Sequence, residues 1–245
     1  MYAGLKVLAV TICTALVLAS VRPVQAEDPL QDPRPSDPKR IKQILETCVQ
    51  CHGAGGISNI PSRPSIAGQR GDYVAQQLTA FLRTAKKHQA DSDNDADDGT
   101  LNDPISQGRM RADPIMEHMV EGLTPSTIVK VAQAVSKMPC RVDGVLIKFP
   151  PPTAPAITRS CAACHGEDGV GDRFDTPILA GQQRAYLRRE LLLIRESAWG
   201  AQPREGESSR SHPIMESQVA RLRIQDVDAV AKYYSELDCR GNSSK

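Results

Sequence analysis

Apolar side chains recur at helical spacing along most of the chain. A first helix is expected to begin near Lys39, and its buried face carries Ile41, Ile44, Leu45 and Cys48. No stretch alternates between apolar and polar residues for long enough to argue for a sheet. The pattern therefore predicts an all-α fold.

Capping residues and a proline predict where the later helices begin. Asp72 is expected to cap a helix that runs through Leu82. Thr124 followed by Pro125 is a typical N-cap and first helical position, for a helix that ends at about Met138. The second half of the chain repeats this plan, with expected helices over about 156–164, 183–197 and 224–237.

Proline-rich stretches divide the chain. Residues 28–38 should form an extended leader, and residues 149–155 should form a stiff linker. With the boundary near Val145, the sequence predicts two domains, 27–145 and 146–245. Each has about 100 to 120 residues, which is small for a core made of protein alone.

Residues 1–26 are typical of a secretory signal peptide. Lys6 supplies the positive charge, Val7–Leu18 is mainly apolar, and Ala26 ends a small-residue cleavage pattern. The mature chain is therefore expected to begin at Glu27 and to be exported to the periplasm, an oxidising compartment. An uncleaved membrane anchor is the alternative, but the apolar run of about a dozen residues is shorter than the roughly 20 that span a bilayer.

Composition and charge exclude one large class of function. Hydrophobic residues make up 40% of the chain and charged residues 24%, as in ordinary globular proteins, but aromatic residues are only 4%. The 30 Lys and Arg residues nearly balance the 29 Asp and Glu residues. Because the chain lacks a strong positive field, we do not expect it to bind nucleic acid. The shortage of aromatic residues suggests that another apolar body helps to fill the core.

Six of the seven cysteines lie outside the signal segment, and four of these form two matched motifs. Each motif has the pattern C-x-x-C-H, through which c-type haem is attached. Two intervening residues in a helical turn bring both sulfurs to one porphyrin edge, and the next histidine can approach the iron. We therefore expect two covalently bound haem c groups. The attachment residues are Cys48, Cys51, Cys161 and Cys164, and the proximal iron ligands are His52 and His165.

The motifs belong to a longer internal repeat. Up to Tyr73 and Tyr186 the two copies are displaced by 113 residues, and from the P-I-M-E segments onward by 99. The first copy therefore contains 14 extra residues between Tyr73 and Pro114. The matched segments are Ile66–Gln69 with Leu179–Gln182, Pro114–Glu117 with Pro213–Glu216, Leu123 with Leu222, and Cys140 with Cys239.

The repeat also selects a second axial ligand for each iron. After Cys164 the second copy contains a single methionine, Met215, and its counterpart in the first copy is Met116. A thioether is a soft ligand suited to haem iron, and His/Met coordination raises the reduction potential. If both methionines were ordinary core residues, His118 and His212 would be the substitute ligands. The methionines of the first copy that the repeat does not select are Met110, Met119 and Met138.

Two other metal sites fit the sequence less well. Two C-x-x-C pairs could build a Cys₄ zinc centre, but histidine follows each pair and the signal predicts export. The acidic segment 91–98 resembles a calcium loop, but Ala96 stands where an EF-hand loop needs Gly, and Asn102 stands where it needs Glu. We expect a solvated acidic loop there, with contact to a basic partner as the alternative.

These motifs resemble those of the two-haem cytochromes c typified by cytochrome c4 of bacterial periplasms. The resemblance covers nearly all of the mature chain. It implies two tandem cytochrome c domains related by an approximate two-fold axis, with both haems six-coordinate through His and Met. The motifs that carry it are the tandem C-x-x-C-H sequences, the A-G-Q segments followed by Tyr73 and Tyr186, and the P-I-M-E segments that lead to Leu123 and Leu222.

The chain departs from the family at the last helix of each copy. The second copy has Tyr233 and Tyr234 where the first has Ala134 and Val135, and only the first contains the acidic insertion. The two haem pockets are therefore expected to differ in reduction potential.

A second departure is the matched pair Cys140 and Cys239. Leftover cysteines in an exported protein usually pair, and equivalent positions near an approximate two-fold axis can meet. We expect a disulfide that joins the two domains, with two separate buried thiols as the alternative.

The family resemblance implies an electron carrier rather than an enzyme. Its partners would be redox proteins, such as a membrane quinol-oxidising complex and a terminal oxidase or another acceptor, and peripheral association with the membrane stays open. One alternative is a haem subunit of a flavocytochrome-type dehydrogenase. Another is a dihaem enzyme of the peroxidase or thiosulfate-oxidising type, in which one iron must offer an open position.

Overall fold

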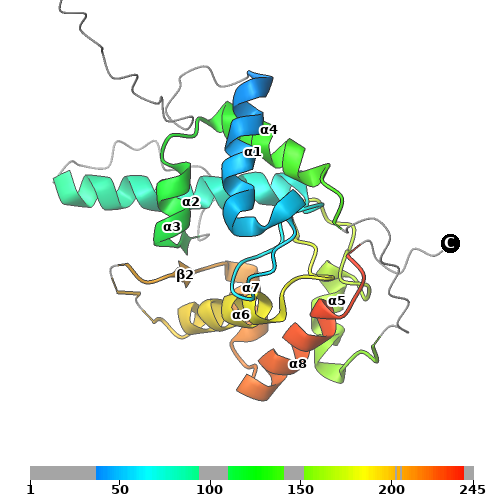
Figure 1. The fold of residues 1–245 in the computed structure, drawn as a ribbon. Helices are drawn as coiled ribbons and strands as arrows, with labels where there is room; N and C mark the ends of the chain where they lie inside the picture. Colours follow the sequence, from blue (N-terminus) through cyan, green and yellow to red (C-terminus); the bar gives the residue numbers. More distant parts are fainter. Residues whose placement is uncertain (1–36, 94–109, 141–151, 202, 205, 240–245) are drawn as a thin grey trace, which may run out of the picture.

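The structure is a computed structural model that describes residues 37–93, 110–140, 152–201, 203–204 and 206–239. The expected signal peptide, residues 28–36 of the expected leader and residues 149–151 of the expected linker lie outside the described residues. The leader prediction is wrong for Pro38, which begins the first helix. Within them the fold is mainly helical, as predicted, and the chain forms two helical halves that lie one above the other in Figure 1. No described helix has the length and apolar character needed to cross a bilayer.

In the first half, the described residues form four α-helices, a 3-10 turn and a very short strand. The long helix α2 packs against α4 and α3, and α1 packs against α4. The elements are α1 (Pro38–His52), η1 (Ala54–Gly56), α2 (Gly71–Asp93), β1 (Arg111–Ala112), α3 (Pro114–Val120) and α4 (Pro125–Ser136).

The second half repeats the order of the α-helices and the strand, but its 3-10 turn precedes the first helix instead of following it. Helix α6 contacts α8 and α7, as α2 contacts α4 and α3. The elements are η3 (Ala156–Thr158), α5 (Arg159–His165), α6 (Arg184–Ala198), β2 (Ser209–Arg210), α7 (Pro213–Val219) and α8 (Ile224–Ser235). The internal repeat in the sequence is therefore a repeat of structure.

Each half has its own apolar core. In the first half, Ile44 of α1 and Val120 of α3 are almost completely buried, together with apolar residues of α2 and α4. In the second half, Leu187 of α6 packs with Ala231 and Tyr234 of α8. The aromatic residues that α8 adds to its core have no counterpart in α4, as the sequence comparison indicated.

Most helix starts agree with the expected signals. Helix α1 begins at Pro38, where the Asp37 carboxylate accepts a hydrogen bond from the Lys39 amide at 2.9 Å. Thr124 caps α4 as predicted, accepting from the Thr127 amide at 3.2 Å. The prediction for Asp72 is wrong, because α2 already begins at Gly71 and Asp72 lies within its first turn.

Two short helices, α3 and α7, were not predicted. Both have seven residues and begin with Pro at the first position. Asp113 and His212 precede them, and the side chains of these residues accept hydrogen bonds from the amides of Met116 and Met215. An Asp-Pro pair is a usable start signal, but seven residues offer too little periodicity to find a helix by pattern alone.

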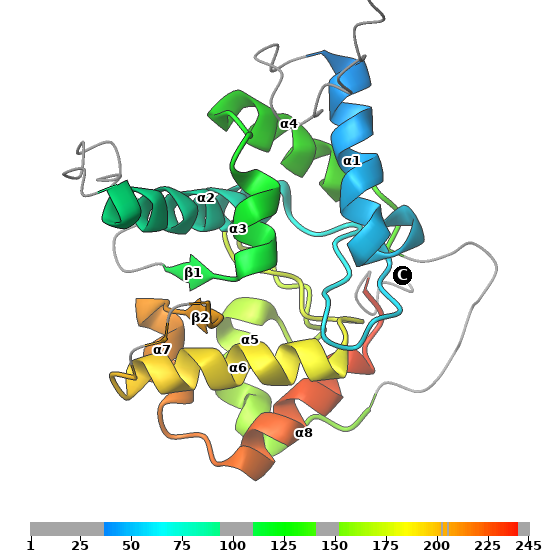
Figure 2. The same cartoon turned by 60° about the vertical axis from the view of Figure 1, so that its left-hand side comes forward.

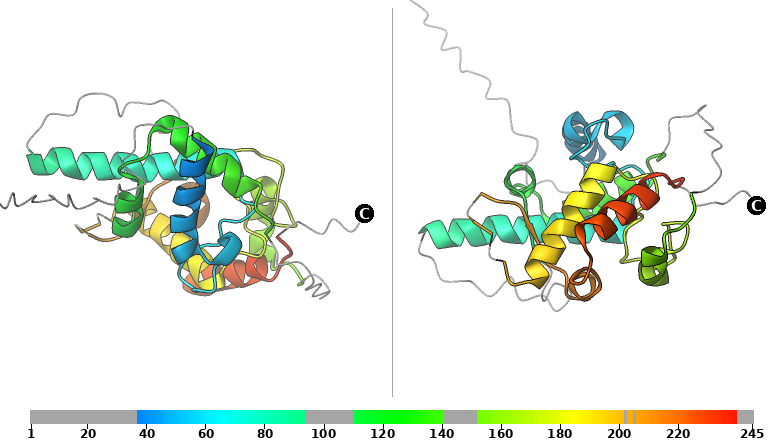
Figure 3. Two further views of the ribbon diagram at one scale, coloured as in Figure 1. Left: turned by 45° about the horizontal axis from the view of Figure 1, so that its top comes forward. Right: turned by 90° about the horizontal axis from the view of Figure 1, so that it is seen from below.

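Part of the insertion in the first copy lengthens a helix. Helix α2 has 23 residues, whereas its counterpart α6 has 15. The end of α2 extends away from the rest of the molecule in both views of Figure 3. The expected acidic loop at 91–98 is wrong for residues 91–93, which continue the helix, and its remainder lies outside the described residues.

The two halves are joined by a small sheet that the sequence did not indicate. Strands β1 and β2 pair antiparallel, with Arg111 opposite Arg210 and Ala112 opposite Ser209 (Figure 2). Each strand has two residues, so neither could show an alternating pattern. Arg111 and Arg210 occupy equivalent positions of the repeat, so the strand pair lies on the approximate two-fold axis.

The expected disulfide between Cys140 and Cys239 is present, with the two Cα atoms 6.2 Å apart. These residues follow α4 and α8, the last helices of the two halves. The bond therefore links equivalent points of the two copies covalently.

Replacing both Cys140 and Cys239 with serine is expected to lower the free energy of unfolding by about 2 to 4 kcal/mol. The bond joins residues 99 positions apart, so its loss frees a long loop in the unfolded chain. Guanidinium titration followed by circular dichroism measures the change. An unchanged midpoint would contradict this account of the bond.

Candidate haem sites

The end of α1 carries the first C-x-x-C-H motif, and α5 carries the second. No disulfide joins the four motif cysteines, which lie in partly buried positions. Burial raises the pKa of Cys48 to about 11 and also raises the pKa of Cys161. Among the described residues, no three His, Cys, Asp or Glu side chains gather into a metal-binding group.

The two motif histidines have equivalent hydrogen-bond partners. His52 Nδ1 lies 2.9 Å from the Pro64 carbonyl oxygen, and His165 Nδ1 lies 3.2 Å from that of Pro177. A carbonyl oxygen only accepts, so each Nδ1 carries the proton and each Nε2 keeps its lone pair. Burial lowers the pKa of both rings and keeps them neutral, which is the form that binds iron.

The two methionines selected by the repeat lie on equivalent short helices. Met116 on α3 is partly buried and packs against the first core. Met215 on α7 is also partly buried. The side chain of His118 is 82% exposed, with Nδ1 3.8 Å from Glu121. His212 accepts a hydrogen bond from the Met215 amide and caps α7.

The residues at the second motif fit a large cofactor with polar groups. Tyr234 is completely buried, yet its hydroxyl has no hydrogen-bond partner among the described residues. Tyr234 belongs to the core cluster against which the motif cysteine Cys161 packs. An acceptor on a bound haem would satisfy this donor. In the first half, the equivalent Val135 packs in the apolar core and offers no such donor.

A buried polar network lies between the two halves. Arg111 donates to the Tyr186 hydroxyl at 2.6 Å, and Arg210 donates to the Tyr73 hydroxyl at 2.9 Å. The two contacts are equivalent in the repeat, so each half contributes one arginine and one tyrosine. This explains the conserved spacing of the tyrosines within the two copies, to which sequence reasoning had assigned no role.

One carboxylate lies at the centre of this network. Glu190 accepts from Arg111 at 3.0 Å and also from Arg210. Burial alone would raise the pKa of Glu190, but the two guanidinium groups hold it below its usual range. Burial raises the pKa of Tyr186 to about 12, so the tyrosine stays neutral. Arg189 also contacts this carboxylate, at 3.4 Å, so the arginines around it outnumber its single negative charge.

Burial is the main cause that lowers the pKa of both candidate iron ligands. Arg63 and then Arg111 add to this effect at His52, and Arg210 adds to it at His165. In the first copy the counterpart of Glu190 is Gln77, so the two sides of the network differ by one charge.

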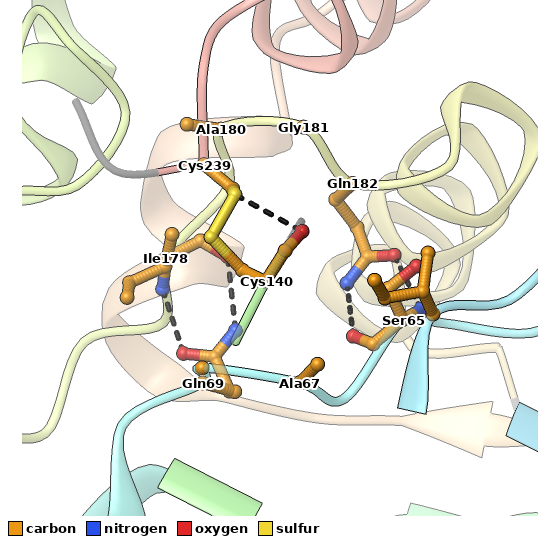
Figure 4. A pocket seen from close by; sticks show the side chains of 11 residues that line it. Ser65, Ala67, Gln69, Cys140, Ile178, Ala180, Gly181, Gln182 and Cys239 are labelled. Carbon is orange, nitrogen blue, oxygen red and sulfur yellow. Dashed lines mark hydrogen bonds between the residues drawn. A yellow bond between two sulfur atoms is a disulfide. The ribbon is translucent and has the colours of Figure 1, made fainter. Parts of the chain in front are cut away.

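The A-G-Q segments meet at the same interface, beside the disulfide (Figure 4). Gln69 exchanges two hydrogen bonds with the backbone of Ile178, and Gln182 exchanges two with the backbone of Ser65. Each glutamine thus binds the opposite half at an equivalent point. The repeated A-G-Q signal was visible in the sequence, but only the structure shows what it contacts.

Comparison with known proteins agrees with this arrangement. The family model Cytochrome c matches residues 155–238. Cytochrome c4 of Stutzerimonas stutzeri is 27% identical over 202 residues, covering 79% of this chain and 85% of the relative. The thiosulfate dehydrogenase electron acceptor of Thiomonas intermedia (strain K12) is 27% identical over 192 residues, covering 76% of each chain.

A shorter relative and a solved structure extend the comparison. Cytochrome c-554(548) of Halomonas halodenitrificans is 30% identical over 79 residues, covering 32% of this chain and 86% of the relative. The crystal structure of reduced recombinant cytochrome c4 from Pseudomonas stutzeri matches with a TM-score of 0.57 and 23% identity. That match covers 82% of this chain and 99% of the other, and it shows that the two-domain fold is shared.

Two helical copies with matched C-x-x-C-H motifs, joined face to face, define a tandem c-type cytochrome. The chain belongs to the cytochrome c family, as a dihaem member of the cytochrome c4 type. It is an electron-transfer protein with two covalently bound haem c groups.

Proposed function

We propose that the protein is a periplasmic electron carrier that accepts electrons from a membrane or periplasmic donor and passes them to a terminal oxidase or another acceptor. The observation that carries the proposal is the pair of equivalent sites, each with two cysteines and one histidine whose Nδ1 donates to a proline carbonyl and whose Nε2 keeps its lone pair. The relatives named cytochrome c4 support it. The expected signal peptide at 1–26 and domains at 27–145 and 146–245 belong to the same proposal.

Each residue set has a distinct task. Cys48 and Cys51 hold the first haem, and the second is held by the cysteines of α5. Met116 is proposed as the second ligand opposite His52, and Met215 has this role opposite His165. When bound, each haem supplies a one-electron centre whose iron cycles between Fe(III) and Fe(II). The remaining attachment residues are Cys161 and Cys164.

The polypeptide keeps these sites fixed during electron transfer. The hydrogen bonds from His52 and His165 to proline carbonyls orient both rings. The disulfide and the buried network hold the two halves together. A rigid environment, in which a histidine and a methionine would both hold the iron of each haem, would suit electron transfer.

A second candidate partner follows from the relatives named thiosulfate dehydrogenase electron acceptor. In that case the protein would accept electrons from a thiosulfate-oxidising enzyme rather than from a quinol-oxidising complex. It would still be a carrier, without bond chemistry of its own.

Stopped-flow reduction of the oxidised protein tests the donor. We expect rapid reduction by a quinol-oxidising complex supplied with quinol, and rapid reoxidation by a terminal oxidase. Rapid reduction by thiosulfate dehydrogenase with thiosulfate, and slow reduction by the quinol-oxidising complex, would favour the second candidate. Thiosulfate oxidation by the protein alone would contradict both.

A further inference from the structure

One peptide group lies between the first proximal histidine and the opposite half of the molecule. The carbonyl of the Pro64–Ser65 peptide accepts from His52 Nδ1 at 2.9 Å. The N–H of the same peptide donates to Gln182 Oε1 at 2.8 Å. A single peptide unit therefore connects His52 to a glutamine of the second half.

The second site repeats this connection in the opposite direction. The carbonyl of the Pro177–Ile178 peptide accepts from His165 Nδ1 at 3.2 Å, and its N–H donates to Gln69 Oε1 at 2.9 Å. Figure 4 shows the two glutamines reaching across the interface on either side of the disulfide. Two contacts of this form, at equivalent positions, are a property of the fold and not an accident of one loop.

Both glutamines are held in place. Each is only 8% exposed. Besides accepting at Oε1, Gln69 donates from Nε2 to the Ile178 carbonyl at 2.9 Å, and Gln182 donates to the Ser65 carbonyl at 2.9 Å. The two bonds fix the amide orientation, so Oε1 always faces the peptide N–H.

Hydrogen bonds in such a chain strengthen one another. Donation from the peptide N–H to Gln Oε1 polarises the peptide and makes its carbonyl a better acceptor for the histidine Nδ1–H. A better acceptor increases the electron density on the imidazole and raises its basicity as a ligand. An electron-rich ligand stabilises Fe(III) relative to Fe(II), so it lowers the reduction potential.

We propose that Gln182 and Gln69 are positioning residues that tune haem potentials across the domain interface, Gln182 acting on the His52 site and Gln69 on the His165 site. The inference rests on the proposed ligation by these histidines. Its consequence is that the arrangement of the two halves sets both potentials.

Substitution of each glutamine by leucine tests the crossed pattern in the full holoprotein. In Gln182→Leu the Fe(III)/Fe(II) ratio of the His52 haem at a fixed applied potential should fall by about threefold to tenfold. At 59 mV per tenfold, this corresponds to a rise of about 30 to 60 mV in its reduction potential. The potential of the His165 haem should change by less than half as much. Gln69→Leu should give the mirror result.

Gln183 offers a matched control. Its side chain also donates across the interface, to the Ser58 carbonyl, but it does not contact the peptide bonded to His52. Gln183→Leu should change either ratio by less than about twofold, as expected for a contact outside the chain of hydrogen bonds. Gln182→Glu keeps an acceptor for the Ser65 N–H, so it should return the potential to the wild-type value or below.

Spectroelectrochemical titration gives both haem potentials. Repeating it with Met116→His assigns them, because the haem whose potential falls in this variant is the one at His52. The result counts when the sulfur-to-iron absorption band of the variant is intact. Under that condition, equal shifts of the two haem potentials in Gln182→Leu, or a shift no larger than in Gln183→Leu, would overturn the inference. If Gln182→Leu does not fold, Gln69→Leu decides alone in the same way. Absence of that band from the wild-type protein would instead contradict the proposed function.

Discussion

Replacing Met116 with histidine is expected to remove about half of the weak long-wavelength sulfur-to-iron absorption, because only Met215 would still supply a thioether. The potential of the affected haem should fall by on the order of 0.2 V, within the about 0.8 V range over which axial ligands set haem potentials. The matched Met215→His variant should remove the other half of the band and lower the other potential. Visible absorption and a redox titration measure both effects.

Met119 is a suitable control, since it lies on the same short helix three residues after Met116 and its counterpart in the repeat is Gln218, not a methionine. Met119→Leu should leave the band and both potentials unchanged. If Met116→His kept the full band, or if Met119→Leu lost half of it, Met116 would not be the ligand.

Replacing Glu190 with alanine is expected to lower the free energy of unfolding by about 3 to 5 kcal/mol. The substitution would leave the buried guanidinium groups of Arg111 and Arg210 close together without their carboxylate. Gln77→Ala removes the uncharged counterpart of Glu190 and should cost about 1 to 2 kcal/mol. Denaturant unfolding of the holoproteins compares the two, and equal losses would contradict the ionic role of Glu190.

The same carboxylate predicts a dependence on pH. The arginines hold the pKa of Glu190 below its ordinary value of 4.5. Its contribution is therefore fully present above about pH 4.5 and is lost as the pH falls through the lower folded-state pKa. Stability of the wild type should decline more steeply than that of Glu190→Gln below pH 4.5. Parallel declines would show that Glu190 does not remain ionised in the fold.

The parts of the molecule that depend on local chemistry could be predicted from the sequence. The start of α4 follows from Thr124 and Pro125, which together satisfy and pre-orient a first turn. The haem motifs follow from two thiols and a histidine at fixed spacing. The Cys140–Cys239 disulfide could be expected once the repeat had paired the two residues, and the structure contains it.

The features that depend on contact between the halves could not be predicted in this way. Arg111 and Glu190 are far apart in sequence and lie in different halves. A charged residue usually indicates a solvated surface, yet both are buried where the two halves meet. The roles of Gln69 and Gln182 were hidden for the same reason, because both bind backbone groups, which no sequence pattern identifies.

The central claim is that the protein is a dedicated electron carrier with two covalent haems. Visible spectroscopy of the purified protein, oxidised and reduced, tests it most directly, together with a haem count and the addition of carbon monoxide. The account predicts two covalent haems per chain, a sulfur-to-iron band of the intensity expected for two haems, and no ready binding of carbon monoxide. Loss of the band from one haem, or rapid carbon monoxide binding there, would indicate an open iron and contradict a dedicated carrier.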